Sequence, residues 1–380
     1  MESKSPIPKP KPPKPERIVY AVSAAPHLKQ IISVKSVMWQ VAMALSPAVI
    51  MSVVFFGINA LLLTLYGIVA AVVTEALVQK FRKLPISVTD GSAVVTGMLV
   101  AFNINSSAPW WIPVVGSVFA IAIGKQIFGG LGHNPMNPAL LARAFLLVSW
   151  PTLMTSGWVP TKLGSISGLN PNIVPETAVK AQNLITSATP LGVAKALRDS
   201  TFVNSLADNL SESQAIAQTI FDKLADFGTI SKLFWGNTGG VIGEVSAAAL
   251  LLGAAYLAYK HIIEWRIPVS YITTVFVLTY IFGGINGLFS ASIMLPVFHV
   301  FSGGLILGAF FMATDMVTSP VTKKGRLYFG IGCGMLTVVI RLVGGYPEGV
   351  SYSILLMNIA VPLIDKMTIP KPFGTVKIKR

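Results

Sequence analysis

Residues 61–78 read LLLTLYGIVAAVVTEALV, and this run decides the fold class because Glu75 is its only charged residue. A helix needs about 20 predominantly apolar residues to cross the hydrocarbon core of a bilayer. Runs of similar character occupy residues 37–56, 110–128 and 241–259. The sequence therefore predicts an integral membrane protein.

The composition of the chain supports the same class. Hydrophobic residues make up 53% of the 380 residues and charged residues 12%, whereas ordinary soluble domains contain about 25% charged residues. The net charge of +14 comes mainly from residues between the apolar runs, so it indicates membrane topology and no nucleic-acid partner. Because Cys333 is the single cysteine, this chain alone can hold neither an iron–sulfur cluster nor a thiolate zinc site.

The apolar runs predict an all-α membrane protein with about ten transmembrane helices. The third and fifth runs are short or interrupted by polar residues, and FSGG at 301–304 favours two half-helices within the eighth. The expected spans are 36–56, 60–79, 90–105, 110–128, 138–152, 242–260, 268–285, 290–314, 326–343 and 350–366.

Positive charges orient these spans. Basic groups such as KFRK at 80–83 and KKGR at 323–326 alternate with short connections that carry no Lys or Arg. This asymmetry places both termini in the cytoplasm. Five spans then precede the long segment 153–241, which falls outside, and five spans of opposite orientation follow it. We predict two inverted five-helix repeats, an arrangement that commonly places a transport pathway at the repeat interface.

The chain thus divides into five parts. The Pro/Lys tract at the N-terminus cannot form a helix or bury a core, so we expect an extended arm near anionic lipid, with PxxP-type docking as the alternative. The predicted parts are a cytoplasmic tail at 1–35, the first membrane repeat at 36–152, an extracytoplasmic loop at 153–241, the second membrane repeat at 242–367 and a basic cytoplasmic tail at 368–380.

Charged residues within the spans are the first candidates for function. Such a charge costs at least ~2.5–3.5 kcal/mol in hydrocarbon, so these side chains face protein, water or one another. Asp90 and Asp315 lie beside small or hydroxyl residues, so they are candidate ion-path residues, with helix capping or pairing as the alternative. We expect Lys125, Arg143 and Glu244, which lie near span ends, to reach towards the interface. The charged residues are Glu75, Asp90, Lys125, Arg143, Glu244, Asp315 and Arg341.

A second candidate is the segment GGLGHNPMNPALLARAFL at 129–146. Its two Asn-Pro steps predict a tight non-helical turn before the next span. This turn is either a re-entrant connection that satisfies its own backbone or the wall of a cofactor or ion cavity. His133 has no companion ligands in the segment, so we expect no metal site.

The third candidate is NLITSATPLG at 183–192. A threonine followed by proline is a common helix start, with Thr189 as the N-cap and Pro190 as the first helical residue. Modification of the Thr189 hydroxyl is the alternative. The chain has neither a GxGxxG fingerprint after a strand nor a P-loop pattern that would indicate a nucleotide site.

Four stretches carry a resemblance to a known family over roughly residues 25–368. The chain resembles the D subunits of Rnf ion-translocating ferredoxin:NAD⁺ oxidoreductase complexes, which are homologous to the B subunit of the sodium-pumping NADH:quinone reductase. The stretches, in order, are DGSAVVTGMLVAFNI at 90–104, GGLGHNPMNPALLARAFLLVSWP at 129–151, TSATPLG at 186–192 and FMATDMVTSPVTKKGRLYFGIGCG at 311–334.

The resemblance implies a covalent FMN, joined through its phosphate to a threonine by a separate Mg-dependent flavin transferase that uses FAD. The family's pattern is an acidic residue followed by Ser-Gly-Ala-Thr, and Thr189 matches the attachment residue. This sequence departs from the pattern in three places and matches it at the alanine. The corresponding positions are Asn183, Thr186, Ser187, Ala188 and Thr189.

The implied function is that of a membrane subunit, in the bacterial inner membrane, that carries electrons from ferredoxin towards NAD⁺ while Na⁺ or H⁺ is moved. The implied partners are the A, B, C, E and G subunits of the Rnf complex, which include a second flavinylated subunit and the Fe–S subunits. The resemblance also implies a noncovalent riboflavin, which no motif locates. Two alternatives are the B subunit of the quinone reductase and a redox-free solute channel. The sequence does not identify the coupling ion.

Overall fold

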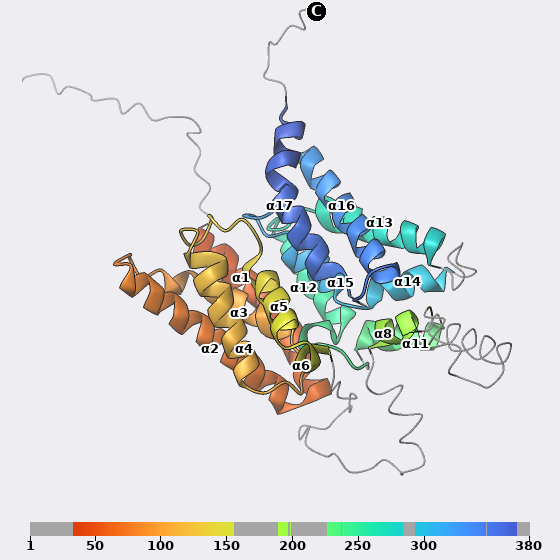
Figure 1. Ribbon diagram of the computed structural model, residues 1–380, viewed down its shortest axis with the longest axis horizontal. Coiled ribbons are helices and arrows are strands. Elements are labelled where there is room, and N and C mark those ends of the chain that lie inside the picture. The colour runs from red at the N-terminus through yellow and green to blue at the C-terminus, as the bar shows by residue number, and fades with distance from the viewer. Residues whose placement is uncertain are drawn as a thin grey trace, which may run out of the picture. The chain divides into compact units, whose positions relative to one another are not determined.

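The regular elements of the protein are helices. A computed structural model describes residues 33–155, 189–196, 198, 226–236, 238–283, 293–346 and 348–370. Within these ranges, β-type pairing is limited to one isolated bridge between Asn105 and Val241. The expected helical class is therefore confirmed. Residues Val34–Arg380 form one compact unit, and the described helices belong to it (Figure 1).

Two groups of helices follow one another along the chain. Figure 1 shows the first group in red to yellow and the second in green to blue. The first group consists of α1 (Val34–Phe56), α2 (Ile58–Phe81), η1 (Val88–Asp90), α3 (Ser92–Phe102), α4 (Trp111–Ile121), the π-helical turn η2 (Ala122–Gln126), α5 (Pro138–Ser149) and α6 (Pro151–Thr155).

The second group begins with short helices and continues with longer ones. Most of the expected loop 153–241 lies outside the described residues, and its described parts contain α8 and α11. The elements are α8 (Pro190–Ala196), α11 (Phe227–Trp235), η4 (Ile242–Glu244), α12 (Ala247–Tyr259), α13 (Arg266–Phe282), α14 (Met294–Phe301), α15 (Leu305–Leu307), the π-helical turn η5 (Gly308–Met312), α16 (Lys323–Leu342) and α17 (Val350–Thr368).

The lengths of these helices make this a multi-pass membrane protein. In the described part of the chain, α1, α2, α16 and α17 are long and apolar enough to cross a bilayer, and α14 with α15–η5 forms an apolar pair bent by 64°, as in a broken span or a re-entrant loop. The bend agrees with the two half-helices expected around FSGG, and their assignment to one span stays a prediction. Five further apolar helices coincide with the remaining expected spans but have only 10–17 residues, so the ten-span arrangement stays a prediction.

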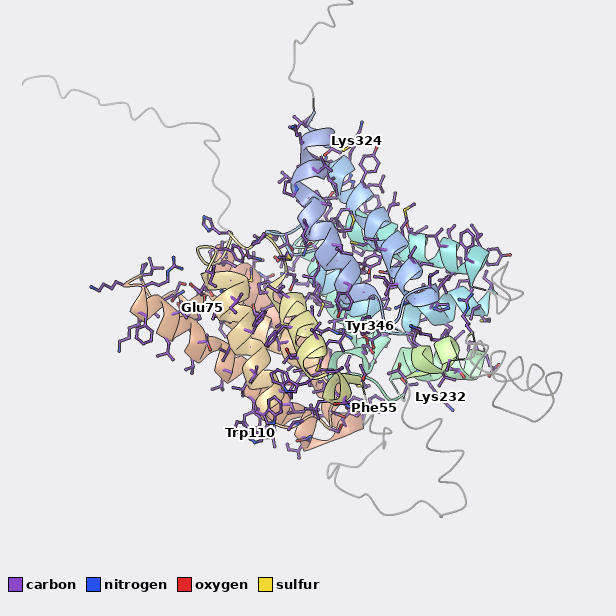
Figure 2. All side chains as sticks on the ribbon, in the orientation of Figure 1. Phe55, Glu75, Trp110, Lys232, Lys324 and Tyr346 are labelled. Carbon is purple, nitrogen blue, oxygen red and sulfur yellow. The ribbon has the colours of Figure 1, made fainter. Side chains whose placement is uncertain are left out.

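Helix α2 shows why the sequence suits a membrane. Its buried face carries small or polar residues such as Gly67, Ala71 and Glu75, whereas large apolar side chains cover its outer face (Figure 2). Soluble helices show the opposite distribution. The outer face therefore suits lipid or a neighbouring subunit. Its exposed apolar residues recur every fourth position, at Leu65, Val69, Val73 and Leu77.

The backbones of α2 and α3 touch where two glycines face each other. A Cβ atom on Gly97 would lie 2.6 Å from the Gly67 carbonyl oxygen, and one on Gly67 would lie 2.9 Å from the Gly97 carbonyl oxygen. Small residues that permit such close approach are typical of helix pairs in membranes. Any larger residue at either position would separate the two helices.

The two groups of helices are joined by packing and by a polar link. Helix α1 packs on α12, and α5 packs on α17. Asn137 caps α5 by accepting from the backbone N–H groups of Ala139 and Leu140, and its Nδ2 atom donates to the Met312 carbonyl at 3.2 Å. One side chain therefore both starts α5 and ties it to the end of η5.

Candidate functional site

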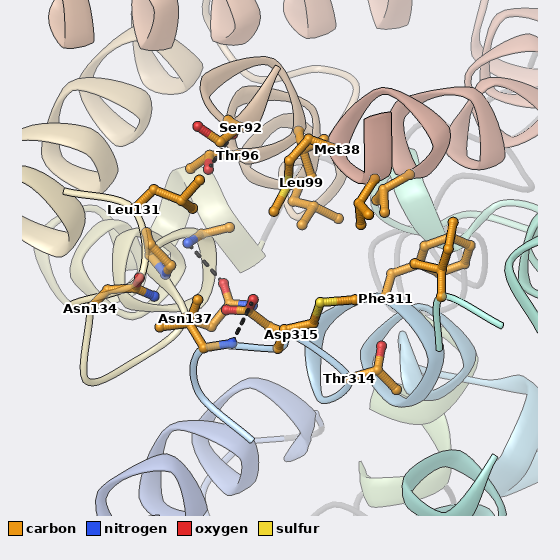
Figure 3. A pocket seen from close by; sticks show the side chains of 18 of the residues that line it. Met38, Ser92, Thr96, Leu99, Leu131, Asn134, Asn137, Phe311, Thr314 and Asp315 are labelled. Carbon is orange, nitrogen blue, oxygen red and sulfur yellow. Dashed lines mark hydrogen bonds between the residues drawn. The ribbon is translucent and has the colours of Figure 1, made fainter. Parts of the chain in front are cut away.

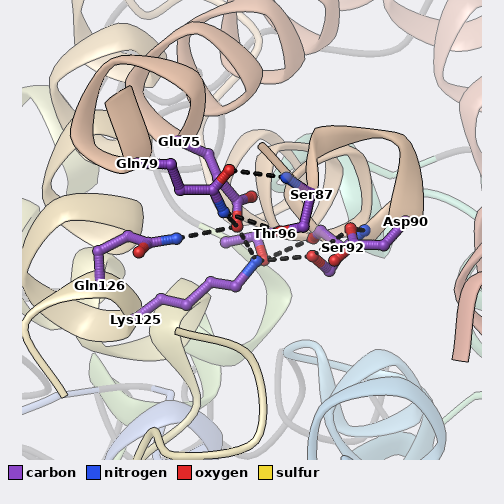
Figure 4. Close-up of polar contacts among 8 residues, drawn as sticks. All are labelled: Glu75, Gln79, Ser87, Asp90, Ser92, Thr96, Lys125 and Gln126. Atoms are coloured by element: carbon purple, nitrogen blue, oxygen red, sulfur yellow. Dashed lines mark hydrogen bonds and ion pairs between the residues drawn. The ribbon is translucent and has the colours of Figure 1, made fainter. Parts of the chain in front are cut away.

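A buried polar network surrounds the C-terminal part of α2 (Figure 4). The Lys125 Nζ atom lies 2.7 Å from Glu75 Oε1 and 2.6 Å from Ser92 Oγ. Gln126 Nε2 donates to the same Glu75 oxygen at 2.9 Å. The π-helical turn η2 thus presents two consecutive side chains to one carboxylate, and such turns occur frequently at functional sites.

This network corrects the expectation that Lys125 reaches towards the membrane interface. The side chain is only 1% exposed, and it is paired with a carboxylate on another helix. A buried charge is tolerated when it is paired and hydrogen-bonded, which explains why the lysine is retained inside the protein. The sequence identified both charges but not their pairing.

Asp90, the last residue of η1, lies at the edge of the network. Its Oδ1 atom accepts from the backbone N–H of Ser92 at 2.8 Å and from Ser92 Oγ at 2.6 Å. Because Ser92 Oγ also contacts Lys125, the aspartate is connected to the buried ion pair through one hydroxyl. Gly91 is the N-cap of α3, so Asp90 binds the first residue of that helix without being its cap. Its role in an ion path stays a prediction.

A mostly apolar pocket lies beside this network (Figure 3). It brings together Lys125, the Asn-Pro segment with Asn134 and Asn137, and Asp315. Two motifs that lie far apart in the sequence therefore form one wall each of the same cavity. Leu99, Leu131 and Phe311 supply apolar surface, so the pocket has the combination of apolar walls and few polar groups that is usual in small-molecule sites.

Asp315 lies three residues after Met312, the last residue of η5, and turns its carboxylate onto its own segment. Its Oδ2 atom accepts from Thr318 Oγ1 at 3.2 Å, and its Oδ1 atom accepts from the backbone N–H of Val317 at 3.4 Å. The aspartate thus lines the pocket while both of its oxygens accept hydrogen bonds from the residues that follow it.

Thr189 is the N-cap of α8, as its local sequence predicts. Its Oγ1 atom accepts from the backbone N–H of Gly192 at 3.2 Å, Pro190 is the first helical residue, and the threonine is 7% exposed. The other residues of the predicted attachment motif lie outside the described residues, namely Asn183, Thr186, Ser187 and Ala188.

Helix α8 is held against the second group of helices. Lys195 Nζ donates to the Gly344 carbonyl, and Arg198 donates to the Phe282 carbonyl at 3.1 Å. Partial burial lowers the pKa of both side chains. These contacts fix the position of Thr189 relative to α13 and the segment after α16.

Thr189 faces a small pocket that the sequence did not reveal. The pocket is shared with Glu244 of η4 and with Ser302 and Gly303 at the break between α14 and α15. The segment 238–240 also lines it. The predicted attachment residue and the broken span therefore meet, although more than 110 residues separate them in the chain.

Arg341 stabilises the break. Its guanidinium donates to the carbonyls of His299 at 2.6 Å, Ser302 at 2.9 Å and Gly303 at 3.2 Å. A helix that ends inside a membrane leaves carbonyl groups that require a partner. Arg341, which is 3% exposed, supplies that partner.

Arg143 is also paired with a carboxylate, and both side chains are partly buried, which corrects its expected position at the interface. It pairs with Glu348 and donates to Asn103 Oδ1 at 2.7 Å. Glu348 was not a candidate because it lies in a connection between two expected spans. Only the fold places this connection against α5.

Glu244 differs from these arginines because it has no ion-pair partner within the described ranges. Its Oε1 atom is buried, which corrects the expectation that this carboxylate reaches the interface. Four buried side-chain atoms around the break have no hydrogen-bond partner among the residues that the structure describes. They are Glu244 Oε1, His299 Nδ1, Ser302 Oγ and Arg341 Nε.

The chain is similar to known proteins along nearly its whole length. The model of the NQR2, RnfD, RnfE family matches residues 21–374. The D subunit of the Na(+)-translocating ferredoxin:NAD(+) oxidoreductase complex of Acetobacterium woodii is 46% identical over 362 residues, which cover 94% of this chain and 96% of that protein.

Two further relatives cover a similar share of the chain. The D subunit of the proton-translocating ferredoxin:NAD(+) oxidoreductase complex of Clostridium ljungdahlii is 46% identical over 94% of this chain and 97% of its own length. The D subunit of the ion-translocating oxidoreductase complex of Aliivibrio salmonicida is 35% identical over 95% of this chain and 100% of its own length.

Proposed function

Because this chain belongs to the NQR2, RnfD, RnfE family, we propose that it is the D subunit of an ion-translocating ferredoxin:NAD⁺ oxidoreductase complex. Such a complex couples electron transfer from ferredoxin to NAD⁺ with the movement of Na⁺ or H⁺ across a membrane. The observation that carries this conclusion is 46% identity over 94% of the chain to two proteins with that name. The other subunits of the complex are its partners.

The membrane arrangement that we propose has ten spans in two inverted repeats within the bacterial cytoplasmic membrane. Both termini lie in the cytoplasm and the loop 153–241 lies outside. Cys333 is buried, so a cysteine introduced elsewhere can be labelled specifically. In intact cells an impermeant maleimide should label Lys162→Cys but not Lys324→Cys. The reverse pattern would contradict the topology.

We further propose that Thr189 carries FMN. The Thr189 hydroxyl oxygen would form a bond to the FMN phosphorus of FAD, the bond from that phosphorus to the bridging oxygen would break, and AMP would leave with that oxygen and the hydroxyl proton. A separate flavin transferase would catalyse this step. When bound, the flavin supplies an acceptor and donor of electrons.

The surroundings of Thr189 are compatible with this group. The threonine hydroxyl lies at a pocket that contains buried polar atoms without partners among the described residues. Helix α8 is fixed by Lys195 and Arg198, so a group on Thr189 would have a defined anchor. The role of this chain's own residues is to hold the phosphate end of the cofactor in place.

Flavin fluorescence in a denaturing gel tests this proposal. The protein made in cells that contain the transferase should give a fluorescent band, and Thr189→Ala should be dark. Thr238→Ala removes a different threonine from the same pocket and should stay fluorescent. A dark wild-type band would reject covalent FMN.

The pocket in Figure 3 is our proposed position for the noncovalent riboflavin that the family resemblance implies. Its apolar walls, which include Leu99, Leu131 and Phe311, suit a planar ring. Denaturation of the wild-type protein should release free flavin into the supernatant. Leu131→Trp, which fills the pocket, should abolish this release and leave gel fluorescence unchanged.

A further inference from the structure

Two buried polar atoms point to a ligand in the pocket beside Thr189. Ser302 is 2% exposed, and its Oγ atom has no hydrogen-bond partner among the described residues. The same holds for Glu244 Oε1. Both residues line the pocket together with Thr189. Leaving such groups unpaired costs about 1–3 kcal/mol each, so a ligand that pairs with them would be favoured.

The charged side chains around this pocket indicate the sign of the charge on the ligand. Arg143 is paired with Glu348, and Arg341 donates to backbone carbonyls. With Glu244 ionised, these four groups would sum to zero. An unpaired buried carboxylate is more stable when neutral, and with Glu244 neutral the group carries one positive charge. An anion of charge −1 would therefore complete the site.

A metal cation is a poorer match for the same atoms. The carbonyl oxygens of Ser302 and Gly303 already accept hydrogen bonds from Arg341. A cation that used these oxygens would also face the guanidinium charge at close range. The available groups are instead donors, namely the Ser302 hydroxyl and a neutral Glu244 carboxyl.

Resting on the proposed attachment of FMN, we propose that this pocket binds the phosphodiester formed on Thr189, with Ser302 Oγ and a neutral Glu244 carboxyl as its hydrogen-bond donors. A phosphodiester carries one negative charge, which matches the excess positive charge of the surrounding side chains. Hydrogen bonds to such an anion are about twice as strong as neutral ones. Ser302 and Glu244 are thus positioning residues for the cofactor.

The test compares the full-length protein made with and without the flavin transferase. The measured quantity is the rise in melting temperature that flavin attachment produces, taken from chains shown by gel fluorescence to carry flavin. Ser302→Ala should lower this rise by half or more. Ser117→Ala is the matched control, because Ser117 is also buried with an Oγ atom unpaired within the described ranges but lies outside the pocket lining.

Glu244 supplies the decisive comparison. Glu244→Gln keeps a neutral donor and should retain the flavin-dependent rise, whereas Glu244→Ala should lose most of it. Equal losses in both variants would overturn the proposal, because they would show that the carboxylate acts as an anion. An unchanged rise in Ser302→Ala would also overturn it. A wild-type protein without covalent flavin would instead reject the proposed function itself, and gel fluorescence identifies that case.

Discussion

At the scale of single residues, the pair formed by Glu75 and Lys125 has the largest energetic consequence. Both side chains are almost completely buried. Removing one partner of a buried ion pair leaves an uncompensated charge and costs about 3–5 kcal/mol, whereas replacing both partners is often close to neutral. The effect of replacing either residue on the free energy of unfolding therefore depends on whether the other residue is present.

Lys125→Met should lower the free energy of unfolding by about 3–5 kcal/mol, because the Glu75 carboxylate loses its cation. The double variant Glu75→Gln with Lys125→Met should recover most of this loss. Thermal or chemical denaturation in detergent measures both effects. Lys324 is exposed, so Lys324→Met is the control. Additive losses in the double variant would show that the two residues are not coupled.

Only some of these side-chain contacts could be predicted from the sequence. The cap at Thr189 depends on neighbouring residues, and the sequence predicted it correctly. The pairing of Lys125 with Glu75 joins residues 50 positions apart, and it depends on a π-helical turn that has no composition of its own. The partner of Arg143 was missed for a similar reason, because Glu348 lies outside every expected span.

At the scale of elements, the break between α14 and α15 is built by two glycines. Gly303 and Gly304 have φ angles of 69° and 63°, a left-handed conformation that glycine adopts without steric cost. A Cβ atom on Gly304 would lie 2.6 Å from Glu244 Oε1. The backbone angle therefore disfavours any residue other than glycine, and a Cβ atom would also require the Glu244 side chain to shift.

Gly304→Ala should lower the free energy of unfolding by about 1–3 kcal/mol, because a residue other than glycine is strained at this backbone angle. The matched control is Gly345→Ala, since a Cβ atom on Gly345 meets nothing within 4 Å. Thermal denaturation of the two variants gives the comparison. Equal stability would mean that the break does not need glycine.

Asn137 allows the cap of α5 to be separated from its link to η5. Asn137→Asp keeps an acceptor for the Ala139 and Leu140 amides but removes the donor to the Met312 carbonyl. Asn137→Ala removes both and should cost about 1 kcal/mol more, the usual value of an N-cap. Melting temperatures of the two variants measure this difference. An Asp variant less stable than the Ala variant would contradict this assignment.

Element positions were largely predictable because apolar runs report burial and lipid contact directly. The FSGG motif even indicated the broken span. The irregular turns were not predictable, because η2 and η5 arise from backbone hydrogen bonding within otherwise ordinary apolar sequence. Short helices such as α11 were also missed, because the nine residues of α11 are too few to form a span.

At the scale of the whole molecule, the candidate ion-path residue Asp315 and the proposed flavin-attachment residue Thr189 lie in different pockets. Asp315 lines the pocket beside the Glu75–Lys125 network, and Thr189 lines the pocket at the broken span. The sequence motifs indicated both regions. They could not indicate that the Asn-Pro segment and Asp315 share one cavity, because that contact requires both groups of helices to fold together.

Asp315→Asn should impair ion translocation more strongly than flavin attachment, because it alters a carboxyl group without touching the Thr189 pocket. Uptake of ²²Na⁺ and protonophore-sensitive pH change in vesicles that contain the whole complex measure the first property, and gel fluorescence measures the second. Asp226→Asn is the control, because Asp226 is exposed and asparagine caps a helix equally well. Equal loss of both properties in Asp315→Asn would indicate misfolding.

The glycine contact between α2 and α3 restricts how the protein can move. The backbone of α2 lies next to the α-carbon of Gly97, and the backbone of α3 lies next to the α-carbon of Gly67. If one helix slid along the other, its larger side chains would clash with the backbone of the neighbouring helix. These two helices should therefore travel as a single rigid body. Interrupted segments, such as the break between α14 and α15, are better suited to move during turnover. A few dihedral angles can change there without unpacking a helix pair.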